Sequence, residues 1–290
     1  MPELPEVETY RRFLDELILQ VPVAAVQVLD AASLTVPEAA LRAALVGRRF
    51  TVSRRVGKNL FLLLSEPAGA ALTLHFGMTG DVAAYRDPED RPRFVRLEII
   101  LGSGLRIGFV DSRKFGRVGL TADVPGFLEA KKLGPDALDD LTSGHLAAAL
   151  ARRKKALLKS ALLDQRLTAG LGNWIVDEVL FQARLHPARR CGELTAPETV
   201  RLHAVIGHVL RTAVGAEARY RDFPPDFLIH AREWEDAPAG ASTTHCPRHP
   251  EELIQKHYVG GRATYWCARC QPAPAGWVSS VAVSLGATSG

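Results

Sequence analysis

Apolar and polar residues alternate in two different ways along the first 125 positions. Between residues 4 and 20, apolar residues are scattered among charged ones, which fits an amphipathic helix. The apolar residues are Leu4, Val7, Phe13, Leu14, Leu17 and Ile18. From residue 21 onward, short apolar runs are separated by turn residues, so we expect strands at 26–28, 60–64, 71–76, 95–101 and 105–110. A leading helix followed by several short strands predicts a β-sandwich or a flattened barrel.

Beyond residue 125 the pattern favours helices. Residues 126–140 are expected to form a linker, and the ranges 141–163, 173–183 and 197–214 have helical composition and spacing. Potential metal ligands gather at 243–271, and the tail 272–290 is small, apolar and rich in Gly and Ser. The sequence shows no internal repeat. We therefore predict an α+β fold with an N-terminal β-sandwich domain at 1–125 and a helical domain at 141–242.

Composition limits the class of protein. With 290 residues, 47% of them hydrophobic, the chain can bury a sizeable core and is expected to form two domains. A net charge of +4 and an isoelectric point near 9.0 suit a polyanionic partner, although a solvated surface carries the same excess. No apolar run reaches transmembrane length, and no basic and then apolar signal segment is seen. We expect a protein that works inside the cell.

The first residues bring an amine next to carboxylates. Removal of Met1, which a small second residue usually permits, would leave the secondary amine of Pro2 beside Glu3 and Glu6 at a helix start. An α-amino group has a pKa of about 7.7–8.0 and is therefore partly free at neutral pH. Such an amine can attack a carbonyl carbon and form a Schiff base. The simpler interpretation is that Pro2 and Pro5 only begin a helix, since proline is favoured in a first helical turn.

Three of the four cysteines indicate a metal site rather than a disulfide framework. Cys246 and His249 are separated by two residues, and so are Cys267 and Cys270 after a further seventeen residues. Two knuckles of this kind suit tetrahedral zinc, which accepts thiolate and neutral imidazole ligands. His230, His245 and His257 are alternative fourth ligands. Only His249 reproduces the two-residue gap. Cys191 stands apart and is expected to be an ordinary thiol.

Two further segments suit a phosphate. The stretch between the knuckles alternates like a β-hairpin and would place Arg262 near its turn, where it is either functional or merely solvated. Residues 164–175 contain Gly170 and Gly172, which allow a tight turn, and then Asn173, which opens a helix whose free N–H groups favour an anion. An ordinary helix-turn-helix junction is the alternative for this second segment.

Several motifs together resemble the formamidopyrimidine-DNA glycosylase and endonuclease VIII family. They are the first octet from Pro2, the run 164–187, the segment Gly-Arg-x-Thr-x-x-Cys-x-x-Cys-Gln ending at Gln271, and the loops 57–60, 75–80 and 111–116. The resemblance spans almost the whole chain. It implies a catalytic β-sandwich domain, a helix-two-turn-helix DNA-binding domain, a zinc-finger hairpin at 243–271 with one structural Zn²⁺, and a DNA cleft between the domains.

The resemblance also implies roles for single residues. Pro2 would attack the sugar, Glu3 would act as acid and base, and Glu6 would support their geometry. Lys58 and Arg262 would bind phosphates around the lesion within the catalytic site. His75 and Asn173 would bind phosphates beside it. Met78, Arg113 and Phe115 would fill the void left by an extruded nucleotide. The implied partner is double-stranded damaged DNA, bound by a monomer in the bacterial cytoplasm at the nucleoid, with no membrane.

Two departures bear on the details. His249 occupies a place where bacterial members usually have cysteine, and residues 217–235 do not match the loop that usually covers the damaged base. The Pro2 to Glu6 segment and Arg113-x-Phe115 resemble the branch that acts on formamidopyrimidines and 8-oxoguanine, so we expect oxidised purines as substrates, removed with β,δ-elimination. The alternatives are a glycosylase for oxidised pyrimidines or single-stranded lesions, and a non-catalytic binder of damaged DNA. A zinc-finger transcription factor is disfavoured because the single finger is appended to a large scaffold.

Overall fold

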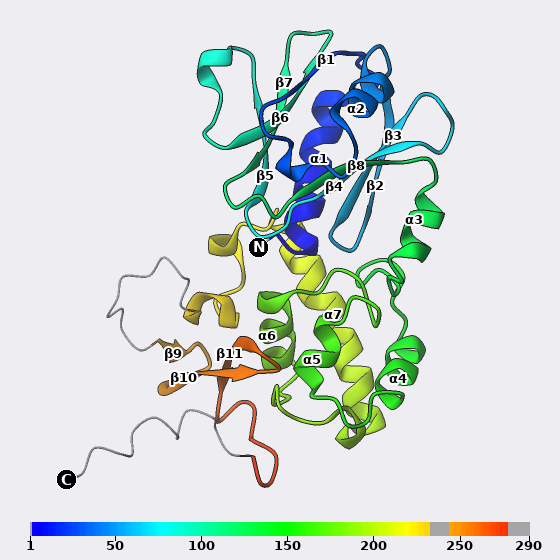
Figure 1. The fold of residues 1–290 in the computed structure, drawn as a ribbon. Coiled ribbons are helices and arrows are strands. Elements are labelled where there is room, and N and C mark those ends of the chain that lie inside the picture. Colours follow the sequence, from blue (N-terminus) through cyan, green and yellow to red (C-terminus); the bar gives the residue numbers. More distant parts are fainter. Residues whose placement is uncertain (1, 233–243, 278–290) are drawn as a thin grey trace, which may run out of the picture. The chain divides into compact units, whose positions relative to one another are not determined.

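The computed structural model describes residues 2–232 and 244–277 (Figure 1). The chain divides into two compact units, Met1–Leu133 and Gly134–Gly290. The first unit contains the sheets expected from the N-terminal sequence. The second contains helices and a small sheet that carries the clustered cysteines, so the predicted α+β class is confirmed.

The first unit is built on two four-stranded antiparallel sheets, with the strand orders β1-β6-β7-β5 and β2-β3-β4-β8. The strands are β1 (Val23–Val28), β2 (Phe50–Val56), β3 (Asn59–Leu64), β4 (Ala71–His75), β5 (Gly80–Tyr85), β6 (Val95–Leu101), β7 (Arg106–Asp111) and β8 (Arg117–Thr121). The helices are α1 (Leu4–Ile18), α2 (Glu38–Leu45) and α3 (Val124–Ala130), with short 3₁₀ turns at Ala31–Ser33 and Pro88–Asp90.

One hydrophobic core holds this unit together. It contains buried side chains of α1, α2 and both sheets, among them Leu14 of α1, Phe50 of β2 and Phe109 of β7. Because both sheets contribute their inner faces to the same core, the unit is a β-sandwich with the leading helix packed into it, as the sequence predicts.

The second unit is arranged around a buried helix. Its helices are α4 (Ser143–Ala151), α5 (Leu158–Leu163), α6 (Asn173–Gln182) and α7 (Ala196–Gly215), and its sheet has the order β11-β10-β9, formed by β9 (His245–Cys246), β10 (His249–Val259) and β11 (Arg262–Cys267). The described residues of this unit also form the 3₁₀ turns η3 (Cys191–Glu193), η4 (Tyr220–Asp222) and η5 (Leu228–Ala231). Residues 174–181 of α6 are all buried, and α6 contacts α5, α7, η5 and β11.

The structure differs from the sequence-based elements in three places. Residues 141–163 form two helices rather than one, because the chain turns at Arg153 and Leu157 then makes a β-bridge with Arg190. The expected strands omitted β2, β5 and β8, and no helix was expected at α2. Within the range 126–140 lie the last turn of α3 and the boundary between the two units.

Candidate functional site

The start of α1 fixes the backbone of the first residues. Glu3 is the N-cap, and its N–H donates to Glu6 Oε2 at 3.0 Å, while its carbonyl accepts from the N–H of Val7 at 3.1 Å. The Glu3 side chain is only 2% exposed, and Pro2 is half-buried. Pro2 and Glu3 are therefore held at the first turn of a helix that packs in the core, and the Glu6 carboxylate is bound to the backbone N–H of Glu3.

An ion-pair cluster joins α1 to the turn that carries Lys58. Glu8 contacts Arg55 at 3.3 Å and Arg11 at 2.7 Å, and Arg55 also donates to the carbonyl of Gly57 at 3.2 Å. Burial alone would raise the pKa of Glu8, but the hydrogen bonds and charges of these arginines outweigh it and hold the pKa below its usual value. Glu8 is thus a carboxylate that anchors the turn, a role that no spacing or motif in the sequence indicates.

Lys58 lies in a two-residue turn between β2 and β3. Val56 pairs with Asn59 across the turn, and Gly57 has φ +58°, a conformation that favours glycine. Asn59 in turn pairs with His75 at the end of β4. Lys58 and His75 are therefore carried at the same end of the sheet β2-β3-β4-β8.

His75 is held as a neutral imidazole. Its Nδ1 accepts a hydrogen bond from the N–H of Gly77 at 3.2 Å. Burial, and then the positive charges of Lys131, Lys58 and Arg117, lower its pKa to about 4. At neutral pH the ring is uncharged, and since Nδ1 accepts, Nε2 carries the proton and can donate to an anion.

Two loops of the first unit are packed against each other and expose three side chains. Gly77 has φ +60°, and a Cβ on it would lie 2.5 Å from the backbone of Phe115. The buried carboxylate of Asp111 accepts from Thr79 Oγ1 at 2.7 Å and from backbone N–H groups of its own loop. The exposed side chains are Met78 at 37%, Phe115 at 49%, and Arg113, whose guanidinium lies 5.3 Å from the centre of the Phe115 ring. The structure brings these three expected residues together.

In the second unit, Asn173 and Arg262 are positioned by one backbone carbonyl. Asn173 is the first residue of α6, and its Nδ2 donates to the carbonyl of Ala263 at 2.9 Å. Its Oδ1 is buried and has no hydrogen-bond partner among the described residues. Arg262 is exposed and follows a tight turn in which Gly260 and Gly261 have φ +58° and +75°. Two phosphate-binding candidates 89 positions apart in the numbering are thus neighbours.

A buried lysine, which the sequence did not single out, also binds the Ala263 carbonyl and so strengthens the link between α6 and β11. Lys159 is fully buried, and its ammonium donates to Asp177 Oδ1 at 2.7 Å and to the same Ala263 carbonyl at 2.9 Å. Arg232 binds the other oxygen of Asp177 at 2.8 Å. A lysine in the apolar run 157–163 was the available signal, because such a residue needs a buried partner.

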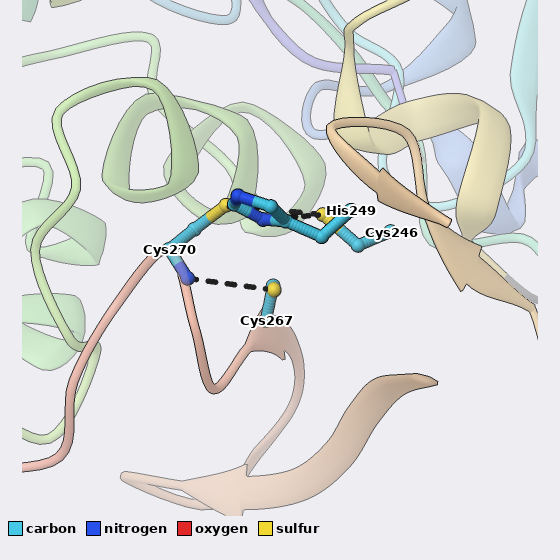
Figure 2. Close-up of side chains that lie close together, drawn as sticks. All are labelled: Cys246, His249, Cys267 and Cys270. Atoms are coloured by element: carbon cyan, nitrogen blue, oxygen red, sulfur yellow. Dashed lines mark hydrogen bonds between the residues drawn. The ribbon is translucent and has the colours of Figure 1, made fainter. Parts of the chain in front are cut away.

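The four expected metal ligands lie together (Figure 2). Their ligand atoms all fall within 4.8 Å of one another; Cys270 Sγ is 3.2 Å from His249 Nδ1 and 3.8 Å from Cys246 Sγ. The donors come from the end of β9, the start of β10, and the end of β11 with the turn that follows it. Three thiols and one imidazole on a short hairpin match the donor set of a structural tetrahedral zinc site, so this cluster can hold a metal ion.

The other candidates for the cluster lie elsewhere. His230 Nε2 contacts the carbonyls of Phe223 and Pro224, and the ring of His257 packs 6.0 Å from that of Trp266. His245 is exposed at the start of β9. Cys191 lies in η3, outside the cluster, and burial raises the pKa of its thiol to about 11. Among the described residues, the histidine of the cluster is therefore His249.

The described part of the stretch 217–235 is packed rather than loose; residues 233–235 lie outside the described residues. Phe223 and Phe227 are buried, and Phe223 lies 5.8 Å from Trp174 between ring centres. Glu178 accepts from the N–H groups of Leu228 at 3.1 Å and of the next residue at 3.0 Å. Burial outweighs these bonds and raises the pKa of Glu178 to about 7. The buried residues of this stretch, at 223, 227–229 and 231, thus pack within the second unit, while residues such as Arg221 remain exposed.

Among the helices of the described part of the chain, none combines the length and apolar character needed to cross a bilayer.

Comparison with known proteins supplies the context for these residues. Residues 1–118 match the model of the formamidopyrimidine-DNA glycosylase N-terminal domain, and residues 133–223 match that of its H2TH domain. The chain is 33% identical to a formamidopyrimidine-DNA glycosylase of Desulforamulus reducens over 94% of this chain and 100% of that protein. It is 34% identical to one of Arabidopsis thaliana over 80% of this chain, spanning 63% of that protein.

A solved structure has the same fold. It is that of MutM in complex with carbocyclic 8-oxo-G containing DNA, with a TM-score of 0.82 and 28% identity. The match covers 94% of this chain and 100% of that one.

Proposed function

Because the chain belongs to the formamidopyrimidine-DNA glycosylase family, and is thereby a DNA glycosylase of base-excision repair, we propose that it removes oxidised purines and then cleaves the strand as an AP lyase. The single observation that carries this proposal is the pair Pro2 and Glu3 at the first turn of α1. A protein that only reads damage has no use for a reactive amine beside a buried carboxyl group.

The proposed chemistry begins at the amine of Pro2, freed by removal of Met1. The amine forms a bond to the sugar C1′ and loses its N–H proton as the bond from C1′ to the base breaks, and the base departs with the electron pair of that bond and takes up a proton. Glu3 supplies a proton to the ring oxygen or to the departing base. The ring then opens to an iminium between Pro2 and C1′.

Strand cleavage follows from the iminium. It acidifies C2′, so loss of a C2′ proton expels the 3′ phosphate, and a second elimination expels the 5′ phosphate. Glu3 is the group available at the helix start to move these protons. This β,δ-elimination needs no redox cofactor, since no atom changes its oxidation state through an external oxidant.

The remaining site residues would bind and distort the DNA. Lys58 and Arg262 supply positive charge, His75 supplies a neutral N–H donor, and Asn173 stands at the start of α6, where free N–H groups favour phosphate. The exposed Met78, Arg113 and Phe115 would enter the space vacated by the extruded nucleotide, because extrusion leaves neighbouring bases without a stacking partner. We further propose double-stranded damaged DNA as the partner and a monomer as the binding species.

The metal proposed for Cys246, His249, Cys267 and Cys270 is zinc in a structural role. When bound it would order the short β9–β10–β11 sheet, whose turn carries Arg262. Gln271 assists through its side chain, which accepts from the Cys267 N–H at 3.1 Å and donates to the carbonyl of Leu185 at 2.9 Å. These bonds tie the ligand turn to the helical part of the unit.

A second candidate function concerns which class of damaged base the enzyme removes. The stretch around Phe223 and Phe227 departs from the loop that usually covers the damaged base in this family, so an altered base preference, such as one for oxidised pyrimidines, is the second candidate. Duplexes that contain 8-oxoguanine, formamidopyrimidine or thymine glycol, incubated with the enzyme, separate the two. Preferential cleavage of the first two is expected. Cleavage of thymine glycol alone would replace the purine proposal, and binding without cleavage of any duplex would favour a non-catalytic reader.

A further inference from the structure

A fourth exposed side chain lies close to the loops of Met78 and Phe115. Phe94 is 45% exposed and has φ +66°, a left-handed backbone conformation that is unusual for an aromatic residue. Among the described residues, the hydrophobic core of the first unit does not include it. Strained backbone at an exposed apolar side chain persists where its surroundings hold it, and such positions gather at functional sites.

Two arginines cover the Phe94 ring. The guanidinium carbon of Arg93 lies 5.0 Å from the ring centre and that of Arg96 lies 5.7 Å from it. Arg93 is itself exposed. The result is an aromatic face combined with positive charge, a pairing typical of surfaces on which nucleic-acid bases stack.

Hydrogen bonds from the Phe94 backbone and from Arg96 connect this patch to the loop 111–116. The carbonyl of Phe94 accepts from the N–H of Asp111 at 3.0 Å, and Arg96 donates to the carbonyls of Asp111 at 2.7 Å and Ser112 at 3.4 Å. The acidic group beside these cations is Asp30, which binds Arg96 at 3.1 Å and Lys114 at 2.8 Å. Its charge is therefore balanced within the cluster.

Sheet register places these parts at one end of the sheet β1-β6-β7-β5. Val95 at the start of β6 pairs with Val110 near the end of β7, and Gly80 at the start of β5 pairs with Asp111. Phe94, the loop that carries Met78 and the loop that carries Phe115 therefore share this end, all within the first unit.

We propose that Phe94, with Arg93 and Arg96, forms a further DNA contact on which an unstacked base lies while the arginines face the phosphate backbone. The inference rests on the proposed function, because it extends the surface of Met78, Arg113 and Phe115. DNA is the occupant that fits, since the patch joins an aromatic ring to an excess of cations. If the patch instead bound an acidic protein or a second copy of this chain, removal of the Phe94 ring would leave the affinity for DNA unchanged.

The test measures the affinity for a duplex with a tetrahydrofuran abasic analogue. Phe94→Ala and Phe94→Leu should each weaken binding about tenfold, the order expected for loss of one base stack, and Phe94→Trp should retain it. Phe13→Ala is the matched control, because Phe13 is 38% exposed in the same unit but lies on α1. Thermal melting of each variant checks folding, and Phe94→Leu keeps an apolar side chain should Phe94→Ala fail to fold.

A fluorescent reporter distinguishes stacking from a change of charge or shape. With 2-aminopurine opposite the abasic analogue or beside it, wild type and Phe94→Trp should quench one of these reporters more than Phe94→Leu does. Equal affinity of wild type and Phe94→Leu, or the same loss in Phe13→Ala, overturns the proposal. If wild type binds the duplex through Phe94 but cleaves no lesion, the proposed function fails and the contact stands. If wild type cleaves and the Phe94 variants bind normally, only the contact fails.

Discussion

The side-chain amide of Asn173 donates a hydrogen bond to the carbonyl of Ala263, 2.9 Å away, and so ties the first residue of α6 to the residue that follows Arg262. Lys159 donates to the same carbonyl at 2.9 Å. One acceptor thus receives both an amide and a buried ammonium. The start of α6 and the turn of the hairpin are held as one rigid element, which is what two residues require if they bind neighbouring phosphates.

This arrangement predicts that Lys159→Met strongly lowers the unfolding free energy of the protein. The substitution removes the cation between Asp177 and Ala263 and leaves a buried carboxylate with Arg232 as its remaining charged partner among the contacts described above. Breaking a buried pair in this way costs about 3–5 kcal/mol of unfolding free energy. Denaturant unfolding should show that loss, together with weaker DNA binding. Lys155→Met is the control, because Lys155 is exposed; equal stability of the two variants would contradict the positioning role.

The metal cluster predicts a contrast between ligand substitutions. Cys267→Ser should release zinc and disorder the Arg262 turn, since the sheet is too small to build a core of its own. His249→Cys should keep the metal, because four thiolates also suit zinc. Cys191→Ser, which alters a thiol outside the cluster, should keep it as well. Elemental analysis and melting temperature are the measurements; absence of zinc from native protein purified without chelators would refute the assignment.

The buried residues of the stretch 217–235 predict an effect on stability as well as on the choice of base. Phe227 is 1% exposed, so Phe227→Ala should cost about 3–5 kcal/mol of unfolding free energy. Deleting residues 222–228 would remove the same core and impair cleavage of lesion and abasic duplexes alike. Arg221→Ala is the sharper probe of selectivity, since that side chain is 83% exposed. It should preserve stability, and a changed ratio of lesion to abasic cleavage would reveal contact with the base.

His75 predicts a pH dependence of stability with a definite sign. Its pKa is lowered from 6.5 to about 4 in the folded protein. Between these values the unfolded chain takes up a proton on this ring and the native chain does not. The contribution of His75 to the unfolding free energy is therefore present above pH 6.5 and is lost as pH falls towards about 4. The unfolding free energy of His75→Gln should lack this part of the slope. A difference between the two proteins that stays constant from pH 7 to 4 would argue against the shift.

Local patterns predicted the parts of the site that depend on local spacing. The two-residue gaps of Cys246 with His249 and of Cys267 with Cys270 were enough to find the cluster, because a knuckle is built from neighbouring residues. The glycines before Arg262 lie in the turn between β10 and β11, and Gly170, three residues before Asn173, has φ +115°.

Contacts between distant residues were not readable in this way. The role of Lys159 depends on Asp177 and Ala263, which no spacing rule connects to it. Strand β5 contains glycine, aspartate and alanines, and it forms because β7 pairs with it along its whole length. For the stretch 217–235 a signal was present, because Tyr220, Phe223 and Phe227 recur three and four residues apart, which is the spacing of a buried face.

The placement of Pro2 predicts a covalent complex that borohydride can trap. The amine nucleophile passes through an iminium with lesion-containing or abasic DNA, and hydride reduces that iminium irreversibly. Peptide mapping should then find the sugar on Pro2. An N-terminal tag that is not cleaved would convert the amine to a peptide bond, and it should abolish the adduct while DNA binding persists.

Substitution of Glu3 separates the two halves of the reaction. Glu3 is buried at the N-cap of α1, so Glu3→Gln keeps the size and the hydrogen-bonding shape of the side chain but removes its proton chemistry. Base excision should fall by about 10²–10⁴-fold, the range typical of a lost general acid or base. Trapping at a pre-formed abasic site should fall less, because no base has to depart there. Glu6→Gln is the matched control, since Glu6 acts on the backbone N–H of Glu3 and should affect both substrates to a similar, smaller degree. A trapped peptide that carried Lys58 while Pro2 remained free would mean that the nucleophile lies in the β2–β3 turn and that the start of α1 serves only to build the fold.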